Sequence, residues 1–482
     1  MLLTVAIVAL IGSFNLGAFL SPYDGGITAS AATFNLHGLF PYRDYWLLYG
    51  PLSGIVVAFP TFVFGPSIEL LRVVGLILLT VEAVVAFRLA NVWAAPAPAV
   101  ALSVSAVVLL PAMLGLDASA WMVAMTLALL AVYLSVGTRR SGLLVGILVG
   151  VAFLSRLDVG AYALAGTLVV RDRRAVLAGF SLVAVPFVAL LLASTPPATL
   201  IEQLLWYPLV GTRQFRGLTG SDGWLGQPAA LLLAVPLILV PRLAIALAAM
   251  RLIRVAVRGT WSAESTTLLG LVVFASACQL QTLGRADFEH FAQAGAPAIL
   301  LLSVWFPVAR PRAFRFTMLS TAVAACVVVG LVGSRLHADT TAYDQNLRSA
   351  SSWIRSATSP QDRVFVGLTT HRYTVLNPLI VYYLADRGPA VHDTMFNPGV
   401  TNTDWGQTRM IADLERSNAP YLVLDRALAE HRETSADGGA PGSTLLDEYL
   451  HKNYRTVCDL GTLVIQARTD ESASPACPSA AP

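Results

Sequence analysis

The chain has 482 residues, of which 56% are hydrophobic and 13% charged, and its formal net charge is +3. With a mean hydropathy of +0.66, it is too apolar for a soluble protein of this length and indicates a polytopic membrane protein. The small net charge, and the lack of a basic stripe interleaved with aromatic residues, exclude a nucleic-acid-binding protein.

The first apolar segment, residues 2–20, is long enough to cross a bilayer. The sequence SPYD follows it, instead of the small-residue site at which a signal peptide is cleaved. We therefore predict that this segment is retained as the first transmembrane span. Residues 21–66 then interrupt the apolar pattern with acids, an Arg, a His and many aromatic residues. We interpret them as the first outer loop.

Apolar runs of spanning length follow through the next three hundred residues. Two short spans are expected between 141 and 170, on either side of SRLD at 155–158, because charged side chains belong at a bilayer face. With the first segment, the sequence predicts eleven transmembrane helices, at 2–20, 69–92, 97–113, 118–136, two within 141–170, 174–194, 225–250, 265–283, 291–309 and 317–334.

Arginine clusters predict the orientation, because cytoplasmic loops carry an excess of basic residues. The clusters placed in the cytoplasm, together with the N-terminus, are those at 139–140, 171–174, 251–258 and 310–315. The run 50–66 is apolar enough to cross, but a crossing there would turn every later cluster outward. It also contains three prolines and three glycines. We therefore predict juxtamembrane helices on the outer face.

The chain becomes polar after the last predicted span. The segments DRVFVGL (362–368) and PYLVLD (420–425) are typical of strands, and 408–419 is typical of an amphipathic helix. This alternation predicts a small extracytoplasmic α/β domain over 335–468, after a transmembrane domain over 1–334. The tail, 469–482, is expected to be disordered.

Two of the four cysteines, Cys458 and Cys477, lie in this polar region. They can pair if the region faces an oxidising compartment. The sequence leaves open whether they do.

Three acids fall on the predicted outer side. Asp24 follows the first span, Asp44 lies in PYRDYW, and Asp117 lies in MLGLDASAW. Carboxylates gathered on one face can supply a general base and a partner that orients it or tunes its pKa. The alternative is that each acid caps a helix or is solvated in a loop, and Asp117 has the sequence context of a helix N-cap.

Basic residues lie in two very short outer loops. Arg156 is in LSRLDVG, and Arg285 and His290 are in LGRADFEHF. Arg suits bidentate binding of phosphate, and His can donate to it. The alternative is that each Arg pairs with the Asp two residues along the chain. The sequence has no Walker motif, HExxH, paired CxxC or dinucleotide fingerprint, so soluble nucleotide cofactors are not expected.

These residues carry a resemblance to a known family. The Asp just after the first span, the stretch HGLFPYRDYWLLYGPLSG and the stretch FGPSIELLR that opens the next span resemble the start of bacterial GT-C glycosyltransferases. The similarity is to the protein-mannosyltransferase and aminoarabinose-transferase branch, which uses polyprenyl-phosphate sugars as donors. In that family the segment between the first two spans forms juxtamembrane helices on the outer face.

The resemblance implies a catalytic role for Asp24, with Asp44 as the second acid of the same loop and Asp117 as a further outer acid. LGRADFEHF resembles a short outer-loop motif of bacterial members. The usual family start has two adjacent acids, whereas here Gly25 follows Asp24. No cofactor is therefore certain, and a divalent cation is left open. The Lys that usually follows the fifth span in this family is absent here, and we interpret Arg156 as the phosphate contact in its place.

The sequence therefore predicts a membrane enzyme that transfers a sugar from a polyprenyl-phosphate carrier to an outer-face acceptor, with inversion. Asp24 is the expected general base, and Arg156, Arg285 and His290 the expected contacts of the donor phosphate. The expected partners are the donor, a glycan, glycolipid or protein acceptor, and the lipid bilayer. The rival hypotheses are a lipid or glycan transporter, which predicts a repeated architecture, and a scaffold protein without activity. The sugar and the acceptor cannot be identified from the sequence.

Overall fold

The structure is a computed structural model of the chain. It describes residues 1–15, 23–114, 116–136, 142–170, 172–211, 235–284, 288–306, 341–373, 376–397, 399–430, 442–471 and 475–478. The chain divides into two compact units. We call residues 1–18, 72–189 and 219–337 the helical unit, and residues 19–71, 190–218 and 338–482 the mixed unit.

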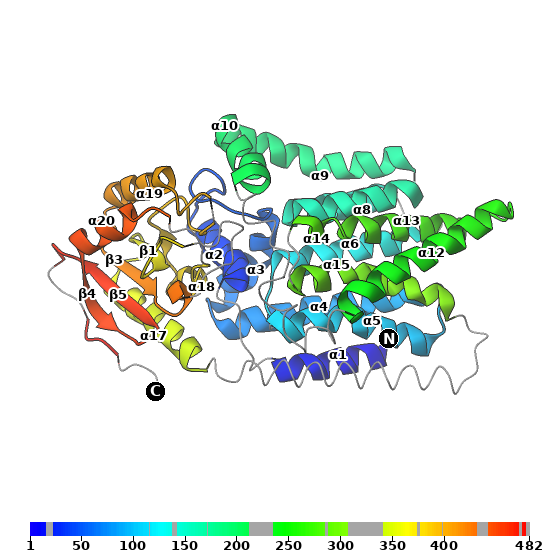
Figure 1. Cartoon of the computed structure of the whole chain (residues 1–482), viewed down its shortest axis with the longest axis horizontal. Coiled ribbons are helices and arrows are strands. Elements are labelled where there is room, and N and C mark those ends of the chain that lie inside the picture. Colours follow the sequence, from blue (N-terminus) through cyan, green and yellow to red (C-terminus); the bar gives the residue numbers. More distant parts are fainter. Residues whose placement is uncertain are drawn as a thin grey trace. The chain divides into compact units, whose positions relative to one another are not determined.

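The helical unit is built from apolar helices that lie roughly along one direction (Figure 1). Two of its elements are irregular: η3 is a π-helix and η4 a 3₁₀-helix. Its described elements are α1 (Leu2–Asn15), α4 (Ile68–Ala90), α5 (Pro96–Leu114), α6 (Ala120–Val136), α7 (Gly142–Ser155), α8 (Leu157–Val170), α9 (Arg173–Ser194), η3 (Val235–Leu239), α12 (Val240–Val257), α13 (Ala263–Cys278), α14 (Gln281–Gly284), α15 (Phe288–Leu300) and η4 (Leu301–Trp305).

Each predicted span that the structure describes contains a helix, and the predicted span 317–334 lies outside the described residues. By length and composition, three of the described helical stretches are sufficient to cross a membrane: Ile68–Ala90, Arg173–Ser194 and Ala263–Leu283. Shorter apolar helical stretches among the described residues are Leu2–Ser13, Leu52–Phe64, Pro96–Val107, Ala120–Ser135, Gly142–Ser155, Leu157–Val170 and His290–Trp305. The expected set of apolar helices is thus confirmed, while the count of eleven crossings stays a prediction.

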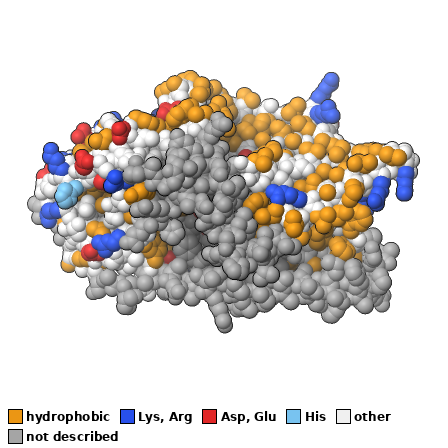
Figure 2. Space-filling model, in the orientation of Figure 1, with side chains coloured by type: hydrophobic (Ala, Val, Ile, Leu, Met, Phe, Trp, Pro, Cys, Tyr) orange, Lys and Arg blue, Asp and Glu red, His pale blue; other side chains and the backbone are white. Residues whose placement is uncertain are grey.

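Several helix ends that carry Arg residues lie at the same end of the helical unit. In Figure 1, α1 begins at the end of the unit at which α9 begins and α12 ends. Arg88 in the last turn of α4 contacts the Met1 sulfur at 3.3 Å, which places the end of α4 there too. The start of α9 and the end of α12 carry the described Arg clusters, and Figure 2 shows basic side chains at two outer tips of the hydrophobic part, with a further basic group nearer its middle. The two predicted cytoplasmic clusters that the structure describes, at 172–174 and 251–258, therefore share one end, and those at 139–140 and 310–315 lie outside the described residues.

The mixed unit combines the first outer loop, residues 190–218 and the C-terminal part of the chain. Its helices are α2 (Asp24–Leu36), α3 (Leu52–Phe64), α10 (Pro197–Ile201), the π-helix η1 (Glu202–Gly211), α17 (Thr341–Ala357), α18 (Ile380–Ala385), α19 (Asp404–Ser417), η6 (Leu428–Glu430) and α20 (Leu445–Asn453). The first outer loop was predicted as part of the transmembrane domain, and the predicted domain boundaries stay predictions.

The C-terminal part of the mixed unit is an α/β fold with a five-stranded sheet in the order β2-β1-β3-β5-β4. The strands are β1 (Arg363–Leu368), β2 (Gly388–Pro389), β3 (Tyr421–Asp425), β4 (Tyr454–Asp459) and β5 (Leu463–Arg468). β1 is parallel to both β2 and β3, whereas β5 is antiparallel to β3 and β4. The predicted strands at 362–368 and 420–425, and the helix between them, are confirmed.

Successive side chains of a strand point to opposite faces of the sheet, and helices cover both faces here. Leu422 and Leu424 of β3 belong to one core with α19 and α20. Tyr421, one residue earlier, meets Trp353 of α17 with ring centroids 5.1 Å apart. The strands are thus buried on both sides, which makes β3 an unbroken hydrophobic run up to Asp425.

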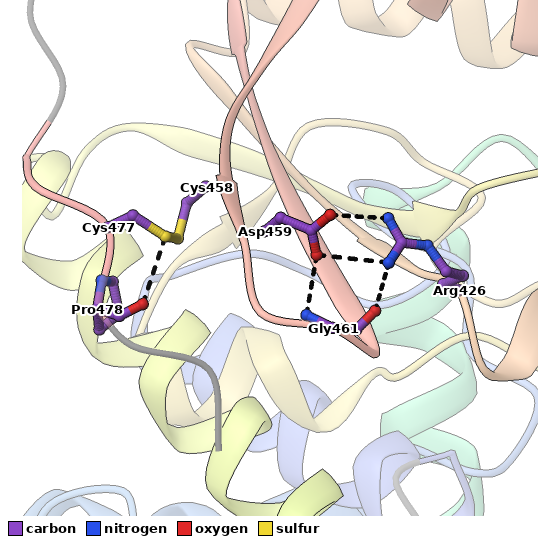
Figure 3. Close-up of a disulfide and its surroundings, with 6 residues drawn as sticks. All are labelled: Arg426, Cys458, Asp459, Gly461, Cys477 and Pro478. Atoms are coloured by element: carbon purple, nitrogen blue, oxygen red, sulfur yellow. Dashed lines mark hydrogen bonds and ion pairs between the residues drawn. A yellow bond between two sulfur atoms is a disulfide. The ribbon is translucent and has the colours of Figure 1, made fainter. Parts of the chain in front are cut away.

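Cys458 on β4 and Cys477 form a disulfide, which answers a question that the sequence left open (Figure 3). The bond ties residues 475–478, within the tail predicted to be disordered, to the edge strand of the sheet. Beside it, Arg426 pairs with Asp459 at 3.0 Å and closes the turn between β4 and β5 by donating to the Gly461 carbonyl (Figure 3).

Candidate active site

Asp24 is the first residue of α2, a helix of 13 residues whose side chains are almost all buried. The carboxylate lies in the first turn, where the unpaired N–H groups and the helix dipole stabilise a negative charge. Asp24 is itself half-buried. The predicted general base is thus a carboxylate held at the start of a rigid, packed helix.

The glycines after Asp24 have a packing role. A Cβ added to Gly26 would lie 2.6 Å from the backbone nitrogen of Ile380, so α2 and α18 pack backbone against backbone. The position at which the family usually has a second acid is Gly25, and it is buried. An additional carboxylate there would have to be desolvated, which gives a physical reason for its absence.

α3 supports α2 from the other side. The face of α3 that carries Ser53, Gly54, Val57 and Thr61 is buried, and a Cβ on Gly54 would touch Ala31 of α2 at 3.0 Å. The opposite face exposes three phenylalanines: Phe59, Phe62 and Phe64, each more than 70% exposed. Small residues inward and Phe outward are as expected for the predicted juxtamembrane helix against lipid.

Asp44 stabilises the turn that follows α2. Its carboxylate accepts from the Phe40 backbone N–H at 2.7 Å and pairs with Arg43 at 2.7 Å. Partial burial alone would raise its pKa, but the Arg43 hydrogen bond and charge, with the Phe40 N–H, hold the pKa of this carboxyl below its usual value. In the same turn Tyr42 has a positive φ of 65°. Asp44 thus has a local structural role in this turn, and its predicted part in the reaction stays a prediction. It also lines a cavity described below.

In the helical unit, Asp117 precedes α6. Its Oδ1 accepts from the Ser119 N–H at 3.1 Å, and the Ser119 hydroxyl accepts from Met122 N–H at 3.4 Å. Ser119, rather than Asp117, is therefore the N-cap of α6. A Cβ on Gly75 of α4 would lie 2.5 Å from the Asp117 carbonyl oxygen, so α4 passes directly over this loop.

Arg156 is the centre of a buried polar cluster in the helical unit. Its Nε donates to Asp158 at 3.0 Å, and Nη1 donates to the Gln293 side-chain oxygen at 3.4 Å. Gln281 donates to the other oxygen of Asp158 at 2.8 Å. The Arg156–Asp158 ion pair expected as the structural alternative is therefore present.

Two further contacts extend this cluster. The Arg156 guanidinium lies 5.0 Å from the centre of the Trp121 ring, four residues beyond Asp117. His290 lies three residues before Gln293 on α15 and so is on the same helix face. Described side chains beside three of the predicted outer loops, those of Trp121, Arg156 and Gln293, thus meet at one end of the helical unit. Arg285 lies outside the described residues, as does its neighbour Asp287.

Sequence reasoning missed an ionic network in the mixed unit. Asp393, whose side chain is fully buried, pairs with Arg409 of α19 at 2.6 Å and with His392 at 3.3 Å. Burial alone would raise the pKa of Asp393, but His392 and Arg409 hold it below its usual value. The Arg409 guanidinium also lies 5.0 Å from the Trp405 ring and donates to the Tyr207 hydroxyl of η1. His392 and Asp393 lie in the connection between β2 and α19, and their spacing in the sequence matches no motif that would have revealed the network.

The described residues contain no cluster of three His, Cys, Asp or Glu side chains that could hold a metal ion. A divalent cation therefore stays an open question for this protein.

The fold defines the class of protein. Searches by sequence match no protein-family model and no curated protein, but solved structures match over nearly the whole chain. These neighbours are GT-C glycosyltransferases, as the resemblance in the sequence predicted.

Two of the neighbours are crystal structures of ArnT from Cupriavidus metallidurans. The apo state has a TM-score of 0.59 at 12% identity and covers 98% of each chain. The form bound to undecaprenyl phosphate has a TM-score of 0.57 at 12% identity, covering 98% of this chain and 99% of that one.

A third neighbour is the oligosaccharyltransferase AglB from Archaeoglobus fulgidus, in complex with an inhibitory peptide and a dolichol-phosphate. Its TM-score is 0.52 at 13% identity, and the match covers 97% of this chain and 74% of that one. At these identities the likeness is one of fold. The chain therefore has the GT-C fold, with apolar helices and a small C-terminal sheet.

Proposed function

We propose that this protein is an inverting membrane glycosyltransferase that transfers a sugar from a polyprenyl-phosphate carrier to an acceptor. The observation that carries the proposal is the position of Asp24, which opens the buried helix α2 directly after the first apolar segment in a chain with the GT-C fold. One neighbour with this fold is described as bound to undecaprenyl phosphate, and another as in complex with a dolichol-phosphate.

The proposed reaction is a single displacement. A carboxylate oxygen of Asp24 takes the proton of the acceptor hydroxyl while that oxygen attacks the anomeric carbon. The bond from this carbon to the phosphate oxygen breaks, and polyprenyl phosphate leaves with the electron pair. Attack from the side opposite the leaving group inverts the anomeric centre.

The leaving phosphate needs cations around it. We assign this role to Arg156, Arg285 and His290, because groups already oriented in a low-dielectric site stabilise developing charge most strongly. Asp158, Gln281 and Gln293 fix the Arg156 guanidinium. Asp117 and Asp44 are assigned to orienting the acceptor or the basic groups.

The orientation belongs to the same proposal. The N-terminus and the described Arg clusters share one end of the helical unit, which we assign to the cytoplasm. The C-terminal domain is then extracytoplasmic, where the Cys458–Cys477 disulfide is stable. The acceptor is a glycan, a glycolipid or a protein.

The test is transfer from a radiolabelled polyprenyl-phosphate sugar by membranes that contain Asp24→Asn. The control is Asp404→Asn, because Asp404 likewise lies in the first turn of a helix, α19. We expect Asp24→Asn to lose transfer by at least about a hundredfold, as for loss of a general base, and Asp404→Asn to retain it. Near-normal transfer by Asp24→Asn would exclude Asp24 as the base. Movement of the lipid across vesicle membranes with no transfer by the unmodified protein would favour a transporter.

A further inference from the structure

A polar cavity of about 870 Å³ lies within the mixed unit. Three segments far apart in the sequence form its wall: the turn 42–44, residues 195–203, and the α/β fold between 361 and 420. The volume is that of a small-molecule site. Of the residues that we assign to the proposed reaction, Asp44 lines this cavity, whereas Asp24 and the proposed phosphate contacts that the structure describes do not.

The cavity is remote from Asp24 along α2. The turn that lines it stays at the C-terminal end of this helix, because the Tyr45 ring packs 4.8 Å from that of Phe34 and the Tyr45 hydroxyl donates to Asn35 at 3.0 Å. Asp24 is at the opposite end of α2, which is roughly 20 Å long for its 13 residues. A group bound in the cavity is therefore not the group that reacts at Asp24.

Two buried polar atoms at the cavity wall have no hydrogen-bond partner among the residues that the structure describes. They are Oγ1 of Thr195 and Oε1 of Gln203. The two side chains are 2% and 3% exposed. The Gln203 amide nitrogen, by contrast, donates to the Tyr42 carbonyl at 3.0 Å. Buried polar atoms are nearly always satisfied. Both residues line the cavity, so a rotation of either side chain would present its oxygen to a ligand that brings hydrogen-bond donors.

The charges around the cavity are largely neutralised in pairs. Arg43 pairs with Asp44, and Arg416 with Asp413, each at 2.7 Å. The amide and hydroxyl groups of the wall outnumber its apolar side chains, which does not suit a lipid tail. The balanced charge does not suit a polyphosphate. A neutral ligand with many hydroxyls, which both donate and accept, matches this wall.

We propose that the cavity binds sugar units of a neutral oligosaccharide acceptor, distant from the unit that receives the transferred sugar. This inference rests on the proposed function and goes beyond it, because it names the acceptor class. Since α2 separates the cavity from Asp24, an acceptor that occupies both sites is an oligomer. A monosaccharide reaches only one of them.

The test variant is Thr195→Val, which keeps the shape of the side chain and removes the hydroxyl. The matched control is Thr126→Val on α6, because Thr126 is also buried and its hydroxyl has no partner among the described residues, but it does not line the cavity. Neither change breaks a hydrogen bond, so the thermal stability of both variants is expected to be unchanged or higher.

Binding is measured by calorimetry on the purified full chain in detergent. The probes are neutral hexose and pentose oligosaccharides of one to six units, with inorganic phosphate and an acidic peptide as the alternatives. We expect affinity to rise with oligosaccharide length, and Thr195→Val to weaken binding by about fivefold, the loss of one hydrogen bond. Thr126→Val is expected to bind like the unmodified protein.

Three results would overturn the inference: no oligosaccharide binds, Thr195→Val binds as tightly as Thr126→Val, or phosphate or peptide binds more tightly than every oligosaccharide. Asp24→Asn separates this inference from the proposed function. It is expected to bind oligosaccharide normally without transferring sugar. If the unmodified protein binds oligosaccharide but transfers nothing, the proposed function fails and the cavity assignment remains. If the unmodified protein transfers sugar but binds no oligosaccharide, the cavity assignment fails and the proposed function remains.

Discussion

Arg409 Nη2 lies 2.6 Å from Oδ2 of Asp393, a carboxylate whose side chain is fully buried. The pair joins α19 to the connection after β2, and through Tyr207 it also holds η1. An ion pair of this kind contributes little net stability when intact, yet removing one partner leaves a buried charge uncompensated.

We therefore expect Arg409→Met to destabilise the protein by about 3–5 kcal/mol. The control is Arg416→Met on the same helix, because the Arg416 side chain is 74% exposed and its pair with Asp413 lies at the surface. That change is expected to cost less than about 1 kcal/mol. Thermal unfolding in detergent measures both. Equal unfolding temperatures for the two variants would contradict the assigned role of Asp393.

A second prediction concerns pH. Asp447 accepts from the His371 Nδ1 at 2.6 Å and from the His371 backbone N–H at 3.0 Å. Burial would raise the pKa of this carboxyl, but the bonds from His371 lower it below its usual value. Its stabilisation is therefore fully present above the unfolded-state pKa of about 3.9 and is lost as pH falls through the lower folded-state pKa.

Asp447→Asn should consequently lower stability by about 1–3 kcal/mol at pH 7. The difference from the unmodified protein should narrow as the pH falls below about 4. Unfolding temperatures recorded from pH 7 to pH 3 measure this gap. A gap that stays constant over the whole range would show that the Asp447 charge does not contribute.

The sequence predicted most of the helical unit and part of the mixed unit. Long apolar runs and Arg clusters are local signals, so the helices and the shared end of their basic residues could be found in advance. The strands β4 and β5 could not, because YRTVCD and LVIQAR mix polar and apolar residues without a clear alternation. The contact of Gln203 with Tyr42 spans 161 residues and that of Arg409 with Tyr207 spans 202, and no local pattern contains such contacts.

The packing of α2 on α18 yields a third prediction. Gly26→Ala would place a methyl group 2.6 Å from the Ile380 backbone nitrogen, and backbone cannot move aside cheaply. We expect a loss of about 1–3 kcal/mol, together with reduced transfer because Asp24 is two residues away. Gly388→Ala is the control, since its nearest neighbour would be 3.5 Å away. Matching stability for the two variants would argue against the close approach of α2 and α18.

The disulfide gives a prediction about both stability and location. Cys458 and Cys477 close a loop across 19 residues, and a cross-link of that size stabilises by about 3 kcal/mol. Cys477→Ser should lower the unfolding temperature of protein prepared without reductant, and added reductant should have no further effect on the variant. Peptide mapping should recover the two cysteines linked in protein isolated from native membranes. Free thiols at both positions would contradict the extracytoplasmic assignment of the domain.

The polar cluster around Arg156 yields the last prediction. The guanidinium uses its planar geometry to reach Asp158 and Gln293 while lying over Trp121, and an ammonium group cannot do all three. Arg156→Lys keeps the charge, so a role in simple charge balance predicts nearly normal transfer. A role in orienting the donor phosphate predicts a loss of transfer of at least about tenfold, since bidentate geometry is lost along with the charge-assisted hydrogen bonds.

The control is Arg254→Lys at the other end of the helical unit, on α12. Transfer assayed at saturating and limiting donor separates the two roles: a defect only at limiting donor assigns Arg156 to binding the carrier, and a defect at both assigns it to the displacement itself.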